Sequence, residues 1–264
     1  MNNPLVRTVL FFFVTMLLVL AGILMVIFFQ LPDVRVWRSQ NPRQTAFMKY
    51  RGEQHAGDTG FHASKIRWLP GKEIPPLFKK TVVVAEDASF WVHHGIDWYE
   101  MRKSLLKDFH QRRLSRGGST ITQQLAKNLY LSPHKSILRK IREAFIAMRL
   151  EKALSKNRIL ELYLNVIEFG PGLYGAETAS QYYFRKPLGD LTLDEMIRLT
   201  AIIPSPLKLN PNRPSAALSW RANVILERLH FYRMVPDEAY FSAKNELDYF
   251  FGRKKRPYRI YFVG

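Results

Sequence analysis

The longest run of apolar residues lies near the N-terminus, where residues 8–29 contain no charged side chain. A helix of that length rises about 33 Å, enough to cross the hydrocarbon core of a bilayer. The run is longer than the apolar core of a secretory signal, and the following "QLPDVRVW" lacks a small-residue cleavage site. We therefore predict an uncleaved transmembrane anchor over residues 8–29. Arginines flank it on both sides, so charge does not fix its orientation.

The pattern changes after the anchor. Residues 30–60 are polar and mixed, with several prolines and glycines, and are predicted to form a juxtamembrane connector. From about residue 72 onward, apolar residues recur at helical spacing almost throughout, and strand-type alternation is weak. The sequence therefore predicts one mostly α-helical domain over residues 61–264, preceded by a single N-terminal transmembrane helix.

Short polar residues and prolines before the apolar-periodic runs predict where helices begin. The predicted starts are at Pro76, at Asp97 with Glu100, at Ser119, at Ser132 with Pro133, at Ser155, and at Thr192 with Glu195. The helix that follows Ser132 is expected to reach about Leu154. Its apolar stripe on one face comprises Ile137, Ile141, Phe145 and Met148.

Charge adds information about partners. The chain has 40 Lys and Arg residues against 22 Asp and Glu residues, a formal net charge of +18. This excess predicts an anionic partner such as nucleic acid, acidic lipid headgroups or a phosphorylated substrate; a merely solvated basic surface is the alternative. Cysteine is absent, which excludes disulfides and thiol chemistry.

Two of the scarce acids stand together in "VVVAEDASFWVHHG", residues 82–95. If the preceding helix ends near Glu86, this carboxylate meets the negative end of the helix dipole, apolar neighbours and the charge of Asp87. All three effects raise the pKa of Glu86. An acid with a raised pKa can accept a proton near neutral pH. A solvated acidic pair at a helix end is the alternative interpretation.

The stretch "RGGSTITQQ", residues 116–124, combines two glycines with a helix start. Gly117 and Gly118 let the backbone approach a ligand closely. The free N–H groups of the helix that begins at Ser119 and Thr120 suit an anion or sugar hydroxyls. An ordinary glycine turn followed by a serine cap is the alternative.

The stretch "RKIRE" places Arg139 and Lys140 on the same helical face as Glu143. A carboxylate among fixed cations stays ionised while the cations bind phosphate groups. An intrahelical salt bridge of small energetic value is the alternative.

Together with "KNRILELYLN" (156–165) and "AIIPSPLKLNP" (201–211), these three stretches resemble the bacterial peptidoglycan glycosyltransferase family. That family also forms the N-terminal half of bifunctional penicillin-binding proteins. Five blocks match in order, over roughly residues 60–230. Because no penicillin-binding domain follows, the resemblance is closest to the monofunctional members. It implies a lysozyme-like, two-lobed α-helical fold that faces the periplasm from the inner membrane, with residues 1–7 in the cytoplasm.

The resemblance also implies a reaction. Lipid II would be polymerised into β-1,4 glycan by inverting transfer, with release of undecaprenyl pyrophosphate. Glu86 would be the general base, and Glu143 would assist at the pyrophosphate, where a divalent cation (Mg²⁺ or Mn²⁺) is also expected. Its protein ligands are left open. The implied substrate-binding residues are Asp87, Ser119, Thr120, Gln124, Lys127, Asn128, Lys135, Arg139 and Lys140.

Two other functions remain open from the sequence. A lysozyme-type hydrolase or lytic transglycosylase that cleaves the wall also uses a helix-end glutamate, but it has no need for cations around a diphosphate. A non-enzymatic, membrane-anchored basic protein would bind nucleic acid or acidic lipid. The usual RNA and DNA signatures are missing, so no nucleic-acid partner is expected. The expected partners are lipid II, the growing glycan, anionic membrane lipids, and proteins of cell division or elongation.

Overall fold

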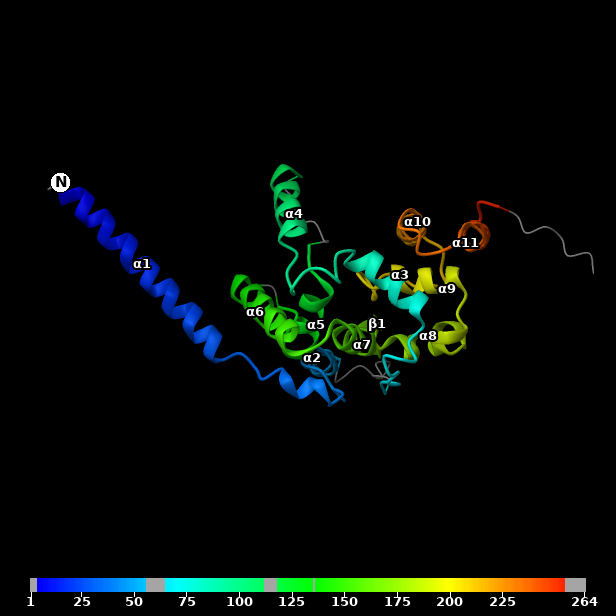
Figure 1. Cartoon of the computed structure of the whole chain (residues 1–264), viewed down its shortest axis with the longest axis horizontal. Helices are drawn as coiled ribbons and strands as arrows, with labels where there is room; N and C mark the ends of the chain where they lie inside the picture. The colour runs from blue at the N-terminus through cyan, green and yellow to red at the C-terminus, as the bar shows by residue number, and fades with distance from the viewer. Residues whose placement is uncertain (1–3, 56–64, 112–117, 135, 255–264) are drawn as a thin grey trace, which may run out of the picture.

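The computed structural model describes residues 4–55, 65–111, 118–134 and 136–254. Its first helix, α1 (Pro4–Phe29), projects from the rest of the chain and exposes nearly all of its apolar side chains (Figure 1). By length and composition α1 could cross a membrane. The predicted N-terminal apolar helix is therefore confirmed, and it begins earlier than predicted, at Pro4.

The chain is mostly α-helical, as predicted, with one short hairpin. After the 3₁₀ turn Arg35–Arg38, the described elements are α2 (Ala46–Gln54), α3 (Pro76–Glu86), α4 (Trp98–Gln111), α5 (Ile121–Tyr130), α6 (Ile137–Ala153), α7 (Lys156–Val166), β1 (Glu168–Gly170), β2 (Leu173–Tyr174), α8 (Ala176–Phe184), the 3₁₀ turn Leu188–Asp190, α9 (Leu193–Ala201), α10 (Ala216–Phe231) and α11 (Asp237–Phe250). The strands β1 and β2 are antiparallel, with Glu168 opposite Tyr174.

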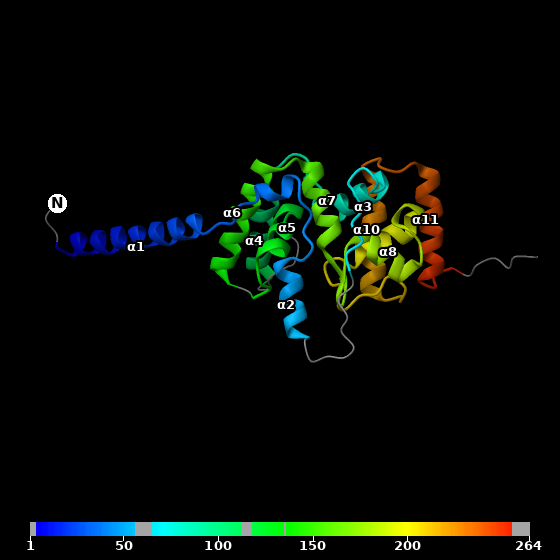
Figure 2. The same cartoon turned by 90° about the horizontal axis from the view of Figure 1, so that it is seen from below.

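These helices form two lobes (Figure 2). The anchor-side lobe contains α2, α4, α5 and α6, and the far lobe contains α3, α8, α9, α10 and α11. Helix α7 lies between them and packs against α5 and α6 on one side and α8 on the other. Side chains with no exposed surface, such as Leu125 of α5, Leu160 of α7 and Phe78 of α3, belong to one apolar core that runs through both lobes. The predicted two-lobed architecture is thus confirmed.

Several helix starts follow the predicted signals. Pro76 occupies the first turn of α3. The Ser155 hydroxyl accepts a hydrogen bond from the Arg158 amide at the start of α7, and Thr192 and Glu195 form a capping box at the start of α9. Ser155 and the Thr192–Glu195 pair satisfy backbone N–H groups that a helix leaves without intrahelical partners, and Pro76 has no N–H group to satisfy.

Helix α5 is capped by Thr120, and the prediction of Ser119 is wrong. The Thr120 hydroxyl accepts from the Gln123 amide, and the Gln123 side chain accepts from the Thr120 amide. Such a reciprocal pair needs Glu or Gln three residues after the cap. Gln123 meets that requirement for Thr120, whereas Thr122 stands three residues after Ser119. The Ser119 side chain is therefore left available for another contact.

Helix α6 begins at Ile137 with Ser136 as its cap, and not at Ser132. The apolar stripe predicted for it is confirmed in its middle only: Ile141 and Phe145 pack against the core, whereas Ile137 is 81% exposed and Met148 is 38% exposed. The core also receives Ile146 and Leu150 from a neighbouring face. Periodicity identifies an apolar face, but it does not say which part of that face packs inward.

Helix α6 also contacts the apolar helix α1. The Arg149 guanidinium donates to the carbonyls of Phe28 and Leu31 at the end of α1, and it lies 4.8 Å from the centre of the Phe28 ring. About two turns earlier, Arg142 donates to the side chain of Gln30. The Arg149 bonds supply donors for carbonyls at the end of α1, where intrahelical partners run out.

The buried aromatic side chains predict where stability resides. Replacing Phe78, which has no exposed surface, by Ala should lower the free energy of unfolding by about 3–5 kcal/mol, because a cavity replaces a packed ring. The matched change Phe241→Ala, at a ring that is 58% exposed, should alter stability by less than about 0.5 kcal/mol. Denaturant unfolding of the detergent-solubilised full chain measures both values. Equal effects would contradict this placement of the core.

Candidate active site

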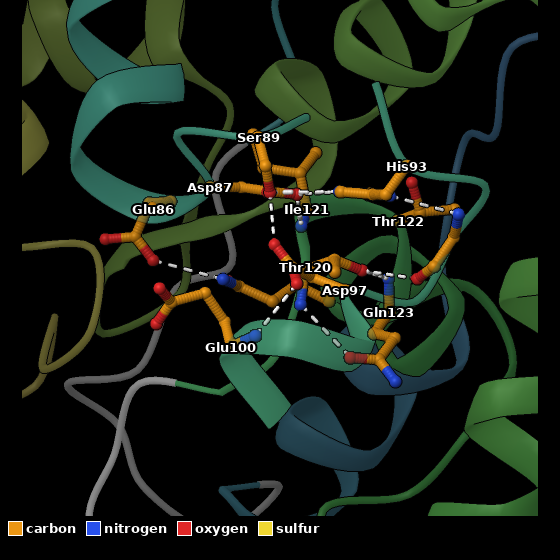
Figure 3. Close-up of polar contacts among 12 residues, drawn as sticks. Glu86, Asp87, Ser89, His93, Asp97, Glu100, Thr120, Ile121, Thr122 and Gln123 are labelled. Atoms are coloured by element: carbon orange, nitrogen blue, oxygen red, sulfur yellow. Dashed lines mark hydrogen bonds and ion pairs between the residues drawn. The ribbon is translucent and has the colours of Figure 1, made fainter. Parts of the chain in front are cut away.

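The turn after α3 is held by the buried carboxylate of Asp87. This side chain accepts a hydrogen bond from the Ile121 amide at 2.9 Å and contacts His93 Nε2 at 2.9 and 3.0 Å (Figure 3). The Gly95 amide donates to His93 Nδ1, so the ring proton lies on Nε2 and is donated to Asp87. The Asp87 side chain therefore links the end of α3 to the first residue of α5 by a hydrogen bond. His93 has a structural role in this turn, since both of its ring nitrogens are held by neighbours.

Gly95 ends this turn with a backbone that favours glycine. Its φ angle is +93°, in the region that side-chain-bearing residues rarely adopt. A Cβ atom there would also lie 3.1 Å from the carbonyl group of Ala147 in α6. The Gly95 carbonyl accepts a hydrogen bond from the Thr120 hydroxyl, which makes a second tie between the turn and α5.

Glu86, the last residue of α3, points away from Asp87 and its partners (Figure 3). Its side chain is only 8% exposed. Gln124 Nε2 donates to one carboxylate oxygen at 3.0 Å, and Arg221 Nη2 lies 3.2 Å from the other. Burial raises the pKa of Glu86, and the charge of Asp87 adds to this effect, while the contacts with Gln124 and Arg221 oppose it. The predicted helix-end acid with a raised pKa is therefore present.

Two neighbours of Glu86 were missed by the sequence analysis. Tyr163 of α7 donates from its hydroxyl to Gln124 Oε1 at 3.0 Å, which fixes the amide so that its NH₂ group faces Glu86. Arg221 comes from α10 and also donates to the Ala201 carbonyl. Burial, together with the nearby Glu86 and Asp87 charges, raises the pKa of Tyr163 well above its usual value, so its hydroxyl stays protonated.

A second charged group lies on α6. The Glu143 side chain is 4% exposed, and Arg139 Nη1 lies 2.8 Å from one of its oxygens. Lys140 Nζ contacts the other oxygen and also donates to the Ser119 hydroxyl at 2.8 Å. The structure thus brings together Ser119, Arg139, Lys140 and Glu143. Two of the three N–H groups of the Lys140 ammonium are used in these contacts, and the third is left for a ligand.

Lys127 of α5 stands beside this group. Burial lowers its pKa; Glu143 and Glu168 oppose that shift, and Arg139 and Lys140 add to it. Among the described residues its ammonium group has no hydrogen-bond or ion-pair partner within bonding distance, and it lies 5.7 Å from the centre of the Phe47 ring. Its donors are therefore also available to an anion.

Helix α5 connects the two charged groups. Gln124 reaches Glu86, and Lys127, three residues later, faces the Glu143 group. Two other residues predicted to contact substrate make hydrogen bonds within the protein. The Thr120 hydroxyl caps α5, and the Asn128 amide donates to the Gln124 carbonyl. Lys135 lies outside the described residues. The resulting site has a buried acid with a raised pKa at one end and a group of cations beside α6 at the other.

The residues around Glu143 do not fit a metal ion held by the protein. Both of its carboxylate oxygens are paired with cations. Within residues 4–55, 65–111, 118–134 and 136–254, no group of three or more His, Cys, Asp or Glu side chains is arranged to hold a metal. The divalent cation expected at the diphosphate therefore stays a prediction.

Comparisons of the sequence with known proteins show the family of the chain. The family model described as Transglycosylase matches residues 53–230. Over 193 residues, 73% of this chain, the chain is 42% identical to the biosynthetic peptidoglycan transglycosylase of Nitrosospira multiformis, of which it covers 84%. It is 39% identical to the protein of the same name from Neisseria gonorrhoeae, and the match covers 75% of this chain and 84% of that protein. A structural match to penicillin-binding protein 1A from Haemophilus influenzae has 22% identity and a TM-score of 0.41, covering 70% of this chain and 18% of that chain.

The Glu86–Arg221 contact leads to a testable prediction. Arg221→Leu removes a cation that lowers the pKa of Glu86, so this pKa should rise further. Infrared titration of the carboxyl band, taken as a difference against Glu86→Gln, measures the value. The matched change Arg228→Leu removes an arginine of the same helix that donates to the Val84 carbonyl, and it should leave the pKa of Glu86 in place. An unchanged or lower pKa in Arg221→Leu would contradict the assigned role.

Proposed function

The chain belongs to the transglycosylase family and is a glycosyltransferase of peptidoglycan synthesis, and we propose that it polymerises lipid II. In this proposal the product is a β-1,4-linked glycan strand, the transfer inverts the donor configuration, and undecaprenyl pyrophosphate is released. The observation that carries the proposal is a buried acid, Glu86, and a separate group of cations that helix α5 connects, since Gln124 of α5 contacts Glu86 and Lys127 of α5 stands beside Arg139 and Lys140 of α6.

In this reaction Glu86 is the general base that accepts the proton of the acceptor hydroxyl. The ionised carboxylate accepts the hydrogen of the acceptor sugar's 4-hydroxyl while that oxygen forms a bond to the donor's anomeric carbon. The bond between this carbon and the diphosphate oxygen breaks, and its electron pair leaves with the diphosphate. One displacement converts an α-linked donor into a β linkage, without a covalent glycosyl-enzyme. The raised pKa gives Glu86 the basicity that this transfer needs, and the Gln124 and Arg221 contacts support its ionised form.

The cations stabilise the negative charge of the leaving diphosphate. Negative charge grows on the diphosphate as the glycosidic bond breaks, and fixed donors aimed at that charge lower the barrier. Lys127, Arg139 and Lys140 are the donors that the site offers. Glu143 acts through Arg139 and Lys140, because each of its oxygens holds one of them in place. Ser119 supports the same arrangement by accepting from Lys140.

The anchor suits this substrate. A polyprenyl-linked donor diffuses in the membrane plane, so an enzyme tied to the same membrane meets it without extraction. The proposal places the chain in the bacterial inner membrane with its helical domain in the periplasm, next to anionic lipids that match its net charge of +18. Proteins of cell division or elongation are the proposed partners.

The wall-cleaving alternative is tested by one assay. A hydrolase or lytic enzyme does not release a diphosphate and has no use for the Lys127 and Lys140 donors. The full chain is placed in vesicles that contain lipid II. Lengthening glycan together with release of polyprenyl diphosphate supports the proposal, whereas cleavage of preformed sacculi without polymerisation contradicts it.

Glu86→Gln should abolish polymerisation while lipid II binding remains near the wild-type value, because an amide keeps the shape of the acid but accepts no proton. The expected loss in kcat is at least about 10²-fold to 10⁴-fold. Glu100→Gln, at an acid of α4 whose side chain is 50% exposed, is the matched control and should retain activity. Wild-type turnover in Glu86→Gln would falsify the assignment.

Lys140→Ala should weaken the donor more than the acceptor. Loss of a charge-assisted hydrogen bond to the diphosphate is worth about 1.5–3 kcal/mol, which corresponds to roughly 10-fold to 100-fold in donor affinity. Lys152→Ala removes an exposed lysine from the last turn of the same helix and should have no such effect. Separate titrations with donor and acceptor analogues measure the difference, and equal loss for both would count against this role for Lys140.

A further inference from the structure

The surroundings of Lys127 include a helix from outside the matched family region. Helix α2 spans Ala46–Gln54, and the family match begins at residue 53. The Phe47 ring is buried against α5, and its centre lies 5.7 Å from Lys127 Nζ. The Arg51 guanidinium lies 5.2 Å from the centre of the same ring. A stretch that the sequence suggests to be a connector therefore supplies the aromatic face beside Lys127.

The second contact of α2 is a largely buried ion pair. Arg51 Nη2 lies 3.2 Å from one oxygen of Glu168, whose side chain is 6% exposed. The other Glu168 oxygen, Arg51 Nε and the Tyr174 hydroxyl have no hydrogen-bond partner among the described residues. A buried ion pair with unmet hydrogen bonds adds little to stability, so the fold alone does not account for it. Glu168 and Lys127 are instead close enough to influence each other's charge.

We propose that Phe47 and Glu168 position Lys127 for the donor diphosphate, and that Arg51 of α2 holds both of them in place. This inference rests on the proposed function, since it presumes that Lys127 meets a diphosphate. The ring face attracts the ammonium group by a cation–π interaction, and the Glu168 carboxylate attracts it by charge. Phe47, Arg51 and Glu168 are positioning residues, because they act through Lys127.

The charges that face Lys127 come from three elements. On α6 they are Glu143, Arg139 and Lys140; on β1 the charge is Glu168; and on α2 it is Arg51, which pairs with Glu168. Burial lowers the pKa of Lys127, while the charges of Glu143 and, to a smaller extent, Glu168 raise it. Burial raises the pKa of Glu168, while Arg51, Lys127 and His55 favour its ionised form. An ionised Glu168 thus favours the protonated form of Lys127.

Two variants test the proposal in the full chain. Phe47→Leu removes the ring and keeps an apolar side chain, and Glu168→Gln removes the charge and keeps the shape. Each should lower the pKa of Lys127, so that the alkaline limb of kcat/KM for lipid II moves to lower pH by about half a pH unit or more. KM for lipid II should rise several-fold, with a smaller change in kcat. Phe47→Tyr, which retains an aromatic face, should restore both values.

The matched control is Met48→Leu. Met48 is as buried as Phe47 and lies on the same helix, so this change perturbs the packing of α2 without removing an aromatic face. It should leave the alkaline limb in place. Lowered thermal stability in Phe47→Leu and Glu168→Gln without any movement of that limb would mean a merely structural role and would overturn the proposal.

A direct readout separates this inference from the proposed function. NMR titration of ¹³Cε-labelled lysine in the detergent-solubilised chain, with the Lys127 resonance assigned by Lys127→Arg, measures the pKa of Lys127. A lower value in both variants supports the positioning role. An unchanged value overturns it, whatever the activity. Failure of the wild-type chain to polymerise lipid II would defeat the proposed function, and the NMR result could still be read.

Discussion

The site depends on the buried carboxylate of Asp87. Its bonds to the Ile121 amide and to His93 join the end of α3 to the start of α5. Because Glu86 precedes Asp87 directly, this junction also fixes where Glu86 stands relative to Gln124 on the next turn of α5. The two neighbouring acids therefore differ. Asp87 stabilises the fold through its hydrogen bonds, and Glu86 is buried with a raised pKa.

Separation of charge is the second constraint. An acid with a raised pKa must stay away from most cations, since a close cation stabilises its ionised form and lowers its basicity. The chain has many cations, but only Arg221 pairs with Glu86 among the described residues, and Arg139 and Lys140 are held by Glu143 instead. Helix α5 keeps the two groups apart while each remains within reach of its side chains. In the proposed reaction, the two groups act on the substrate from opposite ends.

Local rules made much of this architecture predictable. Pro76, Ser155 and Thr192 begin helices because capping chemistry is decided within a few residues. Glu86 and the Arg139–Lys140–Glu143 group could be identified because a helix end and helical spacing are also local. Arg221 could not, since it reaches Glu86 across 135 positions of sequence and nothing local distinguishes it from Arg228, the other arginine of α10. Helix α2 was not anticipated because its short apolar pair, Phe47 and Met48, becomes informative only when it packs on α5. Ser119 and Thr120 were misassigned for a different reason: two adjacent hydroxyls compete, and the position of Gln123 decides between them.

The bonds from Arg149 to the end of α1 have a geometric consequence. Arg149 lies on the same helix as Glu143, six residues away, which corresponds to about 9 Å along the helix axis. If α1 spans the bilayer as proposed, these bonds set the height of the cations above it, because they join α6 directly to the end of α1. In that proposal a headgroup at the membrane surface reaches the donors while its hydrocarbon tail stays in the lipid. The finished sugar polymer then moves outward, away from the plane in which its building blocks arrive.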